Sequence, residues 1–255
     1  MPRPRSGGGT PAARSLLVCL NGTRSAADGA VVPLTPDALA GSAAAAVAAG
    51  ATGVQVHPRT PCGRGSLSPR VLGPVLAAVR ARVRVPVGVC AGARAEPGPA
   101  DRLERVASWT VLPDHASVDW HEPGAERLAA ALLERGVAVE AGLWSDTDGP
   151  DRFARSPLRH RVLRVLAEVG NHDPATAADS ARTLLARIGT AHGRPILLHG
   201  TEGGTWPVLH LARWLGLETR IGLADTLTLP GGGRARSNAE LVEAAVGVSG
   251  RVAVG

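Results

Sequence analysis

The sequence predicts an α/β protein with a single (β/α)8 barrel, and three observations lead to this fold class. Short apolar runs recur eight times along the 255 residues. Each run is followed by a polar or glycine-rich break, and most breaks lead into an alanine-rich amphipathic pattern. Strand–helix alternation alone would also allow a doubly wound sheet, but the count of eight and the absence of an early GxGxxG motif favour the barrel.

The apolar runs have the length and composition of strands buried in a parallel sheet. These predicted strands are residues 15–20, 53–57, 84–90, 116–120, 136–143, 161–168, 194–199 and 218–223. The predicted helices between them are residues 35–49, 68–82, 124–135, 174–188, 206–215 and 237–246. Two of these helices open with a capping side chain followed by proline, at Thr35-Pro36 and Asp173-Pro174. The gaps leave no boundary for a second domain, so the barrel is predicted to span residues 15–255.

The amino-terminal segment and the cysteines bound the cellular setting. Residues 1–14 are rich in Pro, Gly and Arg and lack the apolar core of a signal peptide, which predicts a disordered tail. No apolar run reaches the length of a membrane span. Cys19, Cys62 and Cys90 show no CxxC spacing, which argues against a disulfide framework or a zinc ribbon. These features favour a cytoplasmic protein.

The positive charge is carried entirely by arginine, because the sequence contains no lysine. This excludes a Schiff-base aldolase, covalently held pyridoxal phosphate and a P-loop lysine. The net charge of +6 is spread without a sustained basic run, and aromatic residues make up 2% of the chain. We therefore interpret the charge as a solvated surface that attracts anionic metabolites, not as a nucleic-acid interface.

The stretch from residue 53 to residue 59 indicates where chemistry is expected. Alternation in a strand places Gln55 and His57 on one face and Val54 and Val56 on the other. If the valines pack under helices, His57 lies inside the barrel at the carboxyl end of its strand, where such folds keep their active sites. A buried histidine with one hydrogen-bonded nitrogen is the alternative interpretation.

Other predicted strands also carry polar side chains near their carboxyl ends. Such groups are seldom buried without partners. They include Asn21, Cys90, Glu140, Arg164, Glu168 and His199. For Glu140, Arg164 and Glu168, an internal ion-pair network and a direct catalytic role are both open.

Two glycine-rich loops follow the last two predicted strands, at residues 199–204 and 230–236. In barrels these loops often form a phosphate site from backbone N–H groups and a helix amino terminus. The alternative is that both loops are flexible and exposed. The barrel position favours an anionic ligand, so Gly203, Gly204 and Arg234 are predicted to bind substrate.

Six short motifs carry a family resemblance. They are Cys19-Leu20-Asn21-Gly22, Val56-His57-Pro58-Arg59, Val139-Glu140-Ala141-Gly142-Leu143, Leu198-His199-Gly200, Thr219-Arg220-Ile221-Gly222-Leu223-Ala224-Asp225 and Ser237-Asn238-Ala239-Glu240-Leu241-Val242. In this order, from about residue 18 to residue 246, the chain resembles the β-keto acid cleavage enzyme family, which includes the 3-keto-5-aminohexanoate cleavage enzyme.

The resemblance implies a barrel that binds a divalent metal, usually zinc, and is a homo-oligomer. It implies that a β-keto acid reacts with acetyl-CoA as co-substrate to give acetoacetate and a new CoA thioester. Asp225 resembles the family's proton-transfer base, supported by Arg220 on the same strand, and Cys90 replaces a hydrogen-bonding serine. The further candidates for substrate binding are Asn21, Glu140, His199 and Arg59, the last as a carboxylate anchor.

The metal positions depart from the family pattern. The resemblance places the metal on two histidines of a His-x-His strand and on a glutamate that precedes the catalytic aspartate. Here the first histidine is Gln55 and the glutamate is Ala224, so His57 is the only inherited ligand. A methyl group cannot coordinate a metal, and an amide oxygen is a weak ligand for zinc.

Three outcomes are open for such a chain. The metal site could be rebuilt from His57 and Cys90, with help from His199 or Glu140, because thiolate and imidazole suit zinc. The protein could instead perform metal-free chemistry, or bind a keto acid or CoA ester without cleaving it. The third outcome is a structural partner of an active paralogue.

Overall fold

The structure, a computed structural model, describes residues 15–29 and 31–248. Eight parallel strands close into a barrel in the order of the sequence, and the last strand pairs with the first. The strands are β1 (Leu16–Cys19), β2 (Gly53–Val56), β3 (Val87–Cys90), β4 (His115–Asp119), β5 (Ala138–Trp144), β6 (Arg164–Val169), β7 (Ile196–Gly200) and β8 (Glu218–Ile221). The predicted (β/α)8 barrel is confirmed, whereas the predicted tail at residues 1–14 lies outside the described residues.

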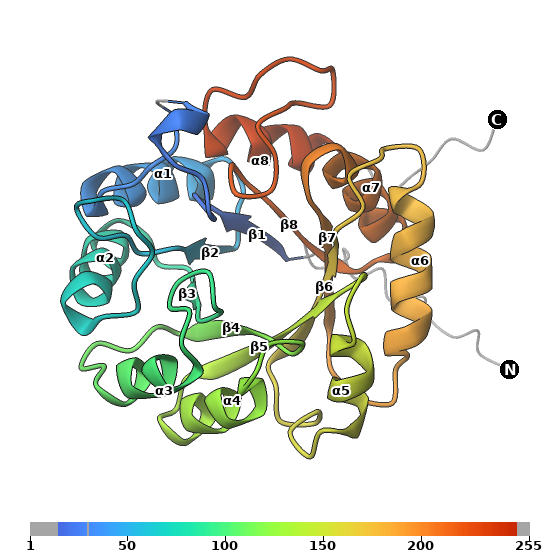
Figure 1. Cartoon of the computed structure of the whole chain (residues 1–255). Coiled ribbons are helices and arrows are strands. Elements are labelled where there is room, and N and C mark those ends of the chain that lie inside the picture. Colours follow the sequence, from blue (N-terminus) through green and yellow to red (C-terminus); the bar gives the residue numbers. More distant parts are fainter. Residues whose placement is uncertain (1–14, 30, 249–255) are drawn as a thin grey trace, which may run out of the picture.

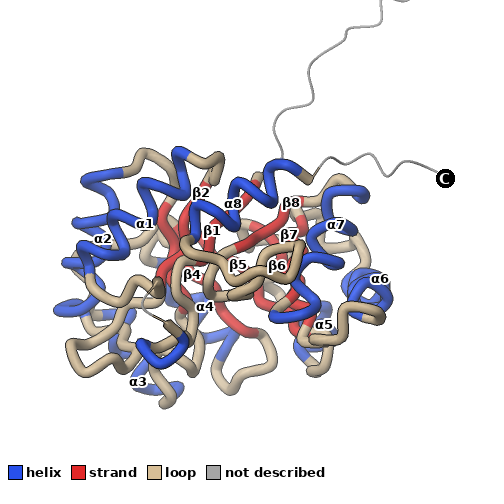
Figure 2. The backbone as a smooth tube through the Cα atoms, turned by 90° about the horizontal axis from the view of Figure 1, so that it is seen from above, coloured by secondary structure: helices blue, strands red, loops and turns tan. Residues whose placement is uncertain are grey.

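The helices surround the strands as an outer ring (Figure 1). They are α1 (Pro36–Ala48), α2 (Pro69–Arg82), α3 (Pro99–Ala107), α4 (Ala125–Glu134), α5 (Gly149–Arg155), α6 (Ala177–Ile188), α7 (Thr205–Leu215) and α8 (Asn238–Gly247), with the short 3-10 helices η1 (Ala26–Asp28) and η2 (Glu202–Gly204). Figure 2 shows the same layering from above, with the strands inside the helices. No helix in the described part of the chain is long and apolar enough to cross a membrane.

The helix boundaries test the predicted capping signals. Thr35 caps α1 as predicted, because its hydroxyl accepts the N–H of Ala38 at 3.2 Å. The predicted opening at Asp173-Pro174 is wrong, since the helix begins only at Ala177. The Asp173 carboxylate instead closes a turn before the helix, where it accepts the N–H of Ala175 at 3.0 Å.

Two helices were not predicted, α3 and α5. The first is dominated by charged residues, and the second is only seven residues long. In α3 only Arg102 and Val106 are buried, so its apolar face is small, and α5 is too short to display a helical period.

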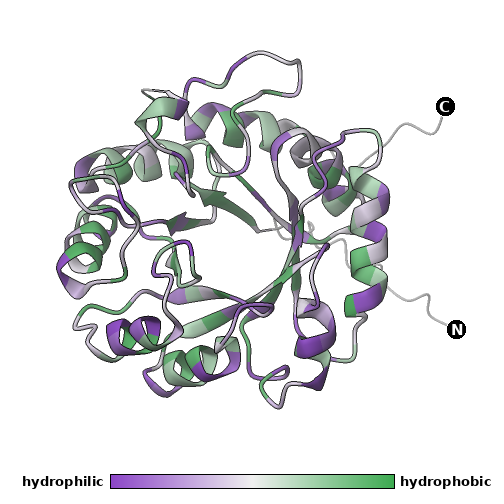
Figure 3. Cartoon of the chain, viewed as in Figure 1, coloured by the Kyte–Doolittle hydropathy of each residue, from purple (hydrophilic) through white to green (hydrophobic). Residues whose placement is uncertain are grey.

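The main core lies between the strands and the helices. Val54 and Val56 of β2 are fully buried there, in one cluster with Leu72 and Leu76 of α2. In Figure 3 the strands are mostly hydrophobic in colour, and the outer helices and loops carry most of the hydrophilic colour. Gln55, between the two valines, is also buried but bonds to Ser117 across the barrel interior. The alternation predicted for this strand is therefore confirmed.

The barrel interior contains an ion-pair network nearer the amino-terminal ends of the strands. Arg164 donates from Nε to Glu140 at 2.7 Å and from Nη1 to Glu218 at 2.7 Å. His115 lies 3.5 Å from the same Glu140 carboxylate. Burial opposes ionisation of Glu140, but His115 and Arg164 outweigh it and hold the pKa of this carboxyl below its usual value. The network fixes the arrangement of the barrel below the site described next.

Candidate functional site

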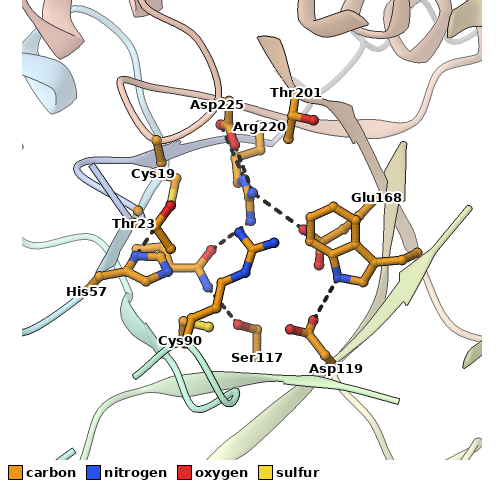
Figure 4. A pocket seen from close by; sticks show the side chains of 15 residues that line it. Cys19, Thr23, His57, Cys90, Ser117, Asp119, Glu168, Thr201, Arg220 and Asp225 are labelled. Carbon is orange, nitrogen blue, oxygen red and sulfur yellow. Dashed lines mark hydrogen bonds and ion pairs between the residues drawn. The ribbon is translucent and has the colours of Figure 1, made fainter. Parts of the chain in front are cut away.

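A cavity opens at the carboxyl ends of the strands, and its volume is about 60 Å³. Such a volume accommodates several water-sized groups, enough for the reacting end of a small organic acid. The strands and the loops that follow them contribute Cys19, Thr23, Gln55, His57, Cys90, Arg94, Ser117, Asp119, Trp144, Glu168, Thr201, Arg220, Ala224 and Asp225 to its lining. Figure 4 shows these side chains converging from all sides of the barrel.

Arg220 and Asp225 form the central ion pair of the cavity. Arg220 lies on β8, and Asp225 lies in the turn after it, where its N–H bonds to the carbonyl of Gly222 at 2.9 Å. Arg220 donates to the carboxylate from Nη2 at 2.8 Å and from Nε at 3.4 Å. Burial opposes the charge on Arg220, but Asp225 and the other acidic neighbours outweigh it and raise the pKa of the guanidinium.

Gln55 joins this pair to the opposite wall of the barrel. Its side-chain oxygen accepts a hydrogen bond from Arg220 Nη1 at 3.2 Å, and its side-chain nitrogen donates to the Ser117 hydroxyl at 2.9 Å. Both ends of the amide are therefore engaged, and the carbonyl oxygen faces a guanidinium. A metal cation bound to this oxygen would have to displace the Arg220 guanidinium.

His57 keeps the form that a metal ligand needs, but it lacks partners for that role. Burial and the nearby Arg220 lower the pKa of His57 to about 3, so the imidazole is neutral. Ala224 presents a methyl group at the third inherited position. Within residues 15–29 and 31–248, no three or more His, Cys, Asp or Glu side chains are grouped so that they could hold a metal ion. The residues of this cavity do not fit a catalytic zinc site.

The alternative metal set of the sequence analysis is divided between two places. His57 and Cys90 both line the cavity. His199 instead lies between two carboxylates, with Nε2 3.1 Å from Glu168 and Nδ1 3.6 Å from Asp225. Glu140 belongs to the deeper ion-pair network with Arg164.

Cys90 and Cys19 are neutral thiols in this site. Burial is the main cause that raises the pKa of Cys90 to about 12, and the nearby Asp119 adds to it. Burial raises the pKa of Cys19 as well. A thiol in this state donates and accepts weak hydrogen bonds but is not a ready nucleophile.

Two carboxyl groups form an acidic wall of the cavity. Burial, followed by the charge of Glu168, raises the pKa of Asp119 to about 6. Burial is also the main cause that raises the pKa of Glu168 to about 7, although Arg220 opposes it. Trp144 donates from its indole nitrogen to Asp119 at 3.1 Å. The cavity thus contains carboxyl groups that change protonation near neutral pH.

Asp119, Ser117, Trp144 and Arg94 line the cavity but were not predicted from the sequence. Ser117 and Asp119 had a usable signal, because alternation along the predicted strand 116–120 places both on one face. Arg94 had none, since it lies in the loop after β3 and reaches the cavity through the fold. Its guanidinium lies 5.3 Å from the centre of the Trp144 ring.

Asn21 and Arg59 hold the backbone around the cavity. The Asn21 amide accepts the N–H of His57 at 3.0 Å and donates to its carbonyl at 2.9 Å. Arg59 donates to the carbonyls of Gly22 at 2.6 Å and Gly63 at 3.0 Å. These contacts fix the β1 and β2 loops, and any role of the two side chains in binding substrate remains a prediction.

The first predicted phosphate loop, residues 199–204, packs against another loop, whereas the second, residues 230–236, is exposed except at Ala235. Gly204 has no room for a side chain, because an added Cβ would lie 2.3 Å from the carbonyl of Asn171. Gly203 meets the carbonyl of His172 in the same way. Arg234 donates to the carbonyl of Asp28. The structure therefore brings together His57, Cys90, Arg220 and Asp225 in the cavity lining but not Gly203, Gly204 or Arg234.

The sequence comparison identifies a family. The model of the family described as beta-keto acid cleavage enzyme matches residues 15–253. No curated protein matches the chain.

Several solved structures share the fold. A ternary complex of ObcA with a C4-CoA adduct and oxalate aligns with a TM-score of 0.65 at 19% identity, over 84% of this chain and 62% of the ObcA chain. Apo ObcA aligns with a TM-score of 0.61 at 18% identity, over 84% and 60% of the two chains. A type I 3-dehydroquinate dehydratase from Clostridium difficile aligns at 0.58 and 12% identity, over 91% of each chain. These likenesses show the barrel fold alone, and this chain spans about three fifths of ObcA.

Proposed function

Because the chain belongs to the beta-keto acid cleavage enzyme family, we propose that it breaks a carbon–carbon bond of a β-keto acid at the mouth of the barrel. The co-substrate in this proposal is acetyl-CoA, and the products are acetoacetate and the CoA thioester of the remaining acyl group. The observation that carries the proposal is the buried ion pair of Arg220 and Asp225 in the lining of the cavity. Arg220 Nη2 lies 2.8 Å from Asp225 Oδ1.

The chemistry proposed for Asp225 is proton transfer at carbon. Its carboxylate takes a proton from the methylene carbon between the keto and carboxylate groups, which leaves an enolate. The enolate attacks the acetyl carbonyl and expels the CoA thiolate. The thiolate then adds to the original keto carbon, and the bond to the methylene carbon breaks. Asp225 returns its proton to that carbon, so acetoacetate and the new thioester form with no net gain or loss of protons.

Arg220 and Arg94 are the proposed partners of the negative charge that develops on the enolate and the thiolate during these steps. Both side chains line the cavity, and Arg220 is 7% exposed, so its charge acts with little screening by water. No step passes through a metal ion, because Gln55 and Ala224 do not supply the ligands that such an ion needs.

A second function, binding without turnover, is favoured because Gln55 and Ala224 replace two metal ligands of the family pattern. A cavity with Ala224 in place of the family's metal-binding glutamate keeps Arg94 and Arg220, and could hold a keto acid or a CoA ester as a bound ligand. The two functions differ in one measurement, because only the first produces acetoacetate.

The experiment uses acetyl-CoA labelled with ¹³C in the acetyl group and a panel of β-keto acids that differ in their side chains. The proposal predicts labelled acetoacetate and a new CoA thioester, both detected by mass spectrometry. Asp225→Asn serves as the inactive control and separates turnover from spontaneous decarboxylation. Calorimetric binding of a keto acid or CoA ester with no labelled product from any acid would favour the second function.

A further inference from the structure

Asp119 and Glu168 reach over the same glycine. An added Cβ at Gly142 would overlap the Asp119 carboxylate and would lie 3.1 Å from Glu168 Oε1. Asp119 comes from β4 and Glu168 from β6, while Gly142 lies on the strand between them. The missing side chain at Gly142 therefore creates the space in which two carboxyl groups from non-adjacent strands approach each other.

The two carboxyl groups are buried, with Asp119 8% and Glu168 5% exposed. Two ionised carboxylates at close range in such a place repel each other, so the pair retains a proton that isolated carboxyl groups would release. The charged or titratable groups that face Glu168 are Cys19, Cys90, Arg94, Asp119, Glu140, His199, Arg220 and Asp225. Those that face Asp119 besides Glu168 are Cys90, Arg94, His121 and Glu122.

Glu168 lies on the side of the cavity that Arg220 and Asp225 also face. Its Oε2 is 3.7 Å from Arg220 Nη2 and 3.1 Å from His199 Nε2. In Figure 4 Asp225 and Asp119 lie at opposite ends of the cavity, with Arg220 and Glu168 between them. A small acid in the cavity would thus have the Asp225 carboxylate at one end and the carboxyl group of Glu168 along its side.

We propose that Glu168 is a second catalytic residue, which in its protonated form donates a hydrogen bond to the keto oxygen while Asp225 removes the methylene proton. Asp119 shares the proton of Glu168 and keeps it in place before substrate binds. The proposal rests on the function proposed above and names the group that polarises the keto carbonyl in a cavity without the ligands for a metal.

The step balances with groups that the chain contains. Asp225 gains the methylene proton, and the electron pair of that C–H bond becomes the enolate. The enolate oxygen receives the hydrogen bond, or the proton itself, from Glu168. When the carbonyl forms again, Glu168 recovers this proton and Asp225 returns its own. A donor of this kind, aimed at the oxygen on which charge develops, lowers the barrier more than the ground state.

The first test needs no substrate. The carboxyl ¹³C resonances of Asp and Glu are followed by NMR across pH in the full chain, and those of Asp119 and Glu168 are assigned from Asp119→Asn and Glu168→Gln. We expect both carboxyl groups to titrate well above their ordinary values, and each to move to lower pH when its neighbour is replaced. Two independent titrations at ordinary values would refute the shared proton.

The second test uses the reaction of labelled acetyl-CoA with a β-keto acid described above. Glu168→Ala removes the donor and is expected to lower kcat/KM by about 10² or more. Glu168→Gln keeps an N–H donor that cannot ionise, so it should retain more activity than the alanine variant. It should also lose the fall in kcat/KM that the wild type shows as Glu168 ionises at alkaline pH. Glu126→Gln, an exposed change at the start of α4, is the matched control.

The outcomes separate the two proposals. If kcat/KM of Glu168→Gln falls at alkaline pH in the same way as that of the wild type, the donor role is overturned, even if acetoacetate forms. A wild-type protein that gives no labelled product with any acid refutes the proposed function and the donor role with it, whereas the NMR titration still decides whether the proton is shared.

Discussion

Arg220 holds Asp225 through two nitrogens, at 2.8 Å from Nη2 and 3.4 Å from Nε, and the two side chains are only 7% and 1% exposed. The fork geometry fixes both oxygens of the carboxylate, and burial removes the water that would otherwise compete for them. The pair is therefore a buried and oriented ion pair and not a surface salt bridge, which suits the base role proposed for Asp225. Its position at the end of β8 places it in the cavity mouth.

Asp225→Asn is expected to lower kcat/KM for β-keto acid cleavage by roughly 10²–10⁴, because the amide cannot accept the methylene proton. Arg220→Lys keeps the positive charge but loses the fork, so it should also reduce activity, although Asp225 remains. Both are measured as release of labelled acetoacetate, with the exposed Glu126→Gln variant as control. Full activity in Asp225→Asn would show that another group is the base.

The metal site that the family resemblance implies can be tested by introducing its missing ligands. Gln55→His together with Ala224→Glu adds an imidazole and a carboxylate next to His57, which are ligands that zinc prefers. We expect this double variant to bind zinc at least about tenfold more tightly than the wild type, as measured by calorimetric titration of untagged protein. Ala224→Glu alone is the control, because it leaves the Gln55 amide bonded to Arg220.

Stoichiometric zinc in wild-type protein purified without chelators would contradict the conclusion that the residues of this cavity do not fit a zinc site. It would mean that ligands outside the inherited positions hold the metal. Elemental analysis decides this point without any assay of activity.

The eight strands were predictable because strands buried in a parallel sheet consist of short runs of apolar residues. Alternation within residues 53–57 also predicts that Gln55 faces the side opposite to Val54 and Val56. The pairing of Arg220 with Asp225 was implied by the family resemblance, in which both positions belong to one motif. The acidic wall was not predicted. Asp119 and Glu168 are far apart in the sequence, and both reach over the backbone of Gly142, which has no side chain to occupy that space.

Arginine roles were the hardest to assign from sequence. Arg59 lies in the most distinctive motif, yet its guanidinium bonds to the carbonyls of Gly22 and Gly63. Arg94 lies in an unremarkable loop and lines the cavity. A long flexible side chain reaches several places from one backbone position, so neither sequence spacing nor strand alternation fixes where its charged end lies.

The three cysteines should differ sharply in reactivity toward a thiol reagent. Cys62 is exposed, and its hydrogen bond with Thr60 is the main cause that lowers its pKa to about 7. Cys19 and Cys90 are buried, and burial raises the pKa of both thiols. We expect one thiol to react rapidly at pH 7.5 in native protein, and Cys62→Ser to abolish that phase. Three equally fast thiols would contradict the buried positions of the other two.

Glu168 should make the stability of the protein depend on pH. Its pKa rises from 4.5 to about 7 on folding, so the folded state binds the proton more tightly than the unfolded state. The stabilisation is complete below the unfolded value and is lost as pH rises through the folded value. At 1.36 kcal/mol per unit, the loss between pH 4 and pH 8 is roughly 3 kcal/mol.

Glu168→Gln removes this titration, so its free energy of unfolding should gain on that of the wild type as pH rises from 5 to 8. Urea unfolding at a series of pH values measures the difference. A difference that stays constant across this range would show that Glu168 does not carry a raised pKa in the folded state.

Two glycine-to-alanine changes of the same chemistry should have opposite effects on stability. Gly142→Ala places a methyl group against the Asp119 carboxylate and close to Glu168. Both carboxyl groups are held in place, Asp119 by the indole N–H of Trp144 at 3.1 Å and Glu168 by His199 at 3.1 Å. We expect it to lower the free energy of unfolding by about 1–3 kcal/mol and to reduce activity, because it forces the two carboxyl groups apart. Gly41→Ala lies inside α1, where an added Cβ meets no heavy atom of the described residues within 4 Å. It should stabilise the helix by about 0.5–1 kcal/mol and leave kcat/KM unchanged. If Gly142→Ala matched Gly41→Ala in both measurements, the close approach of Asp119 and Glu168 over the β5 backbone would be refuted, since an added methyl group cannot share that space with the two carboxyl groups.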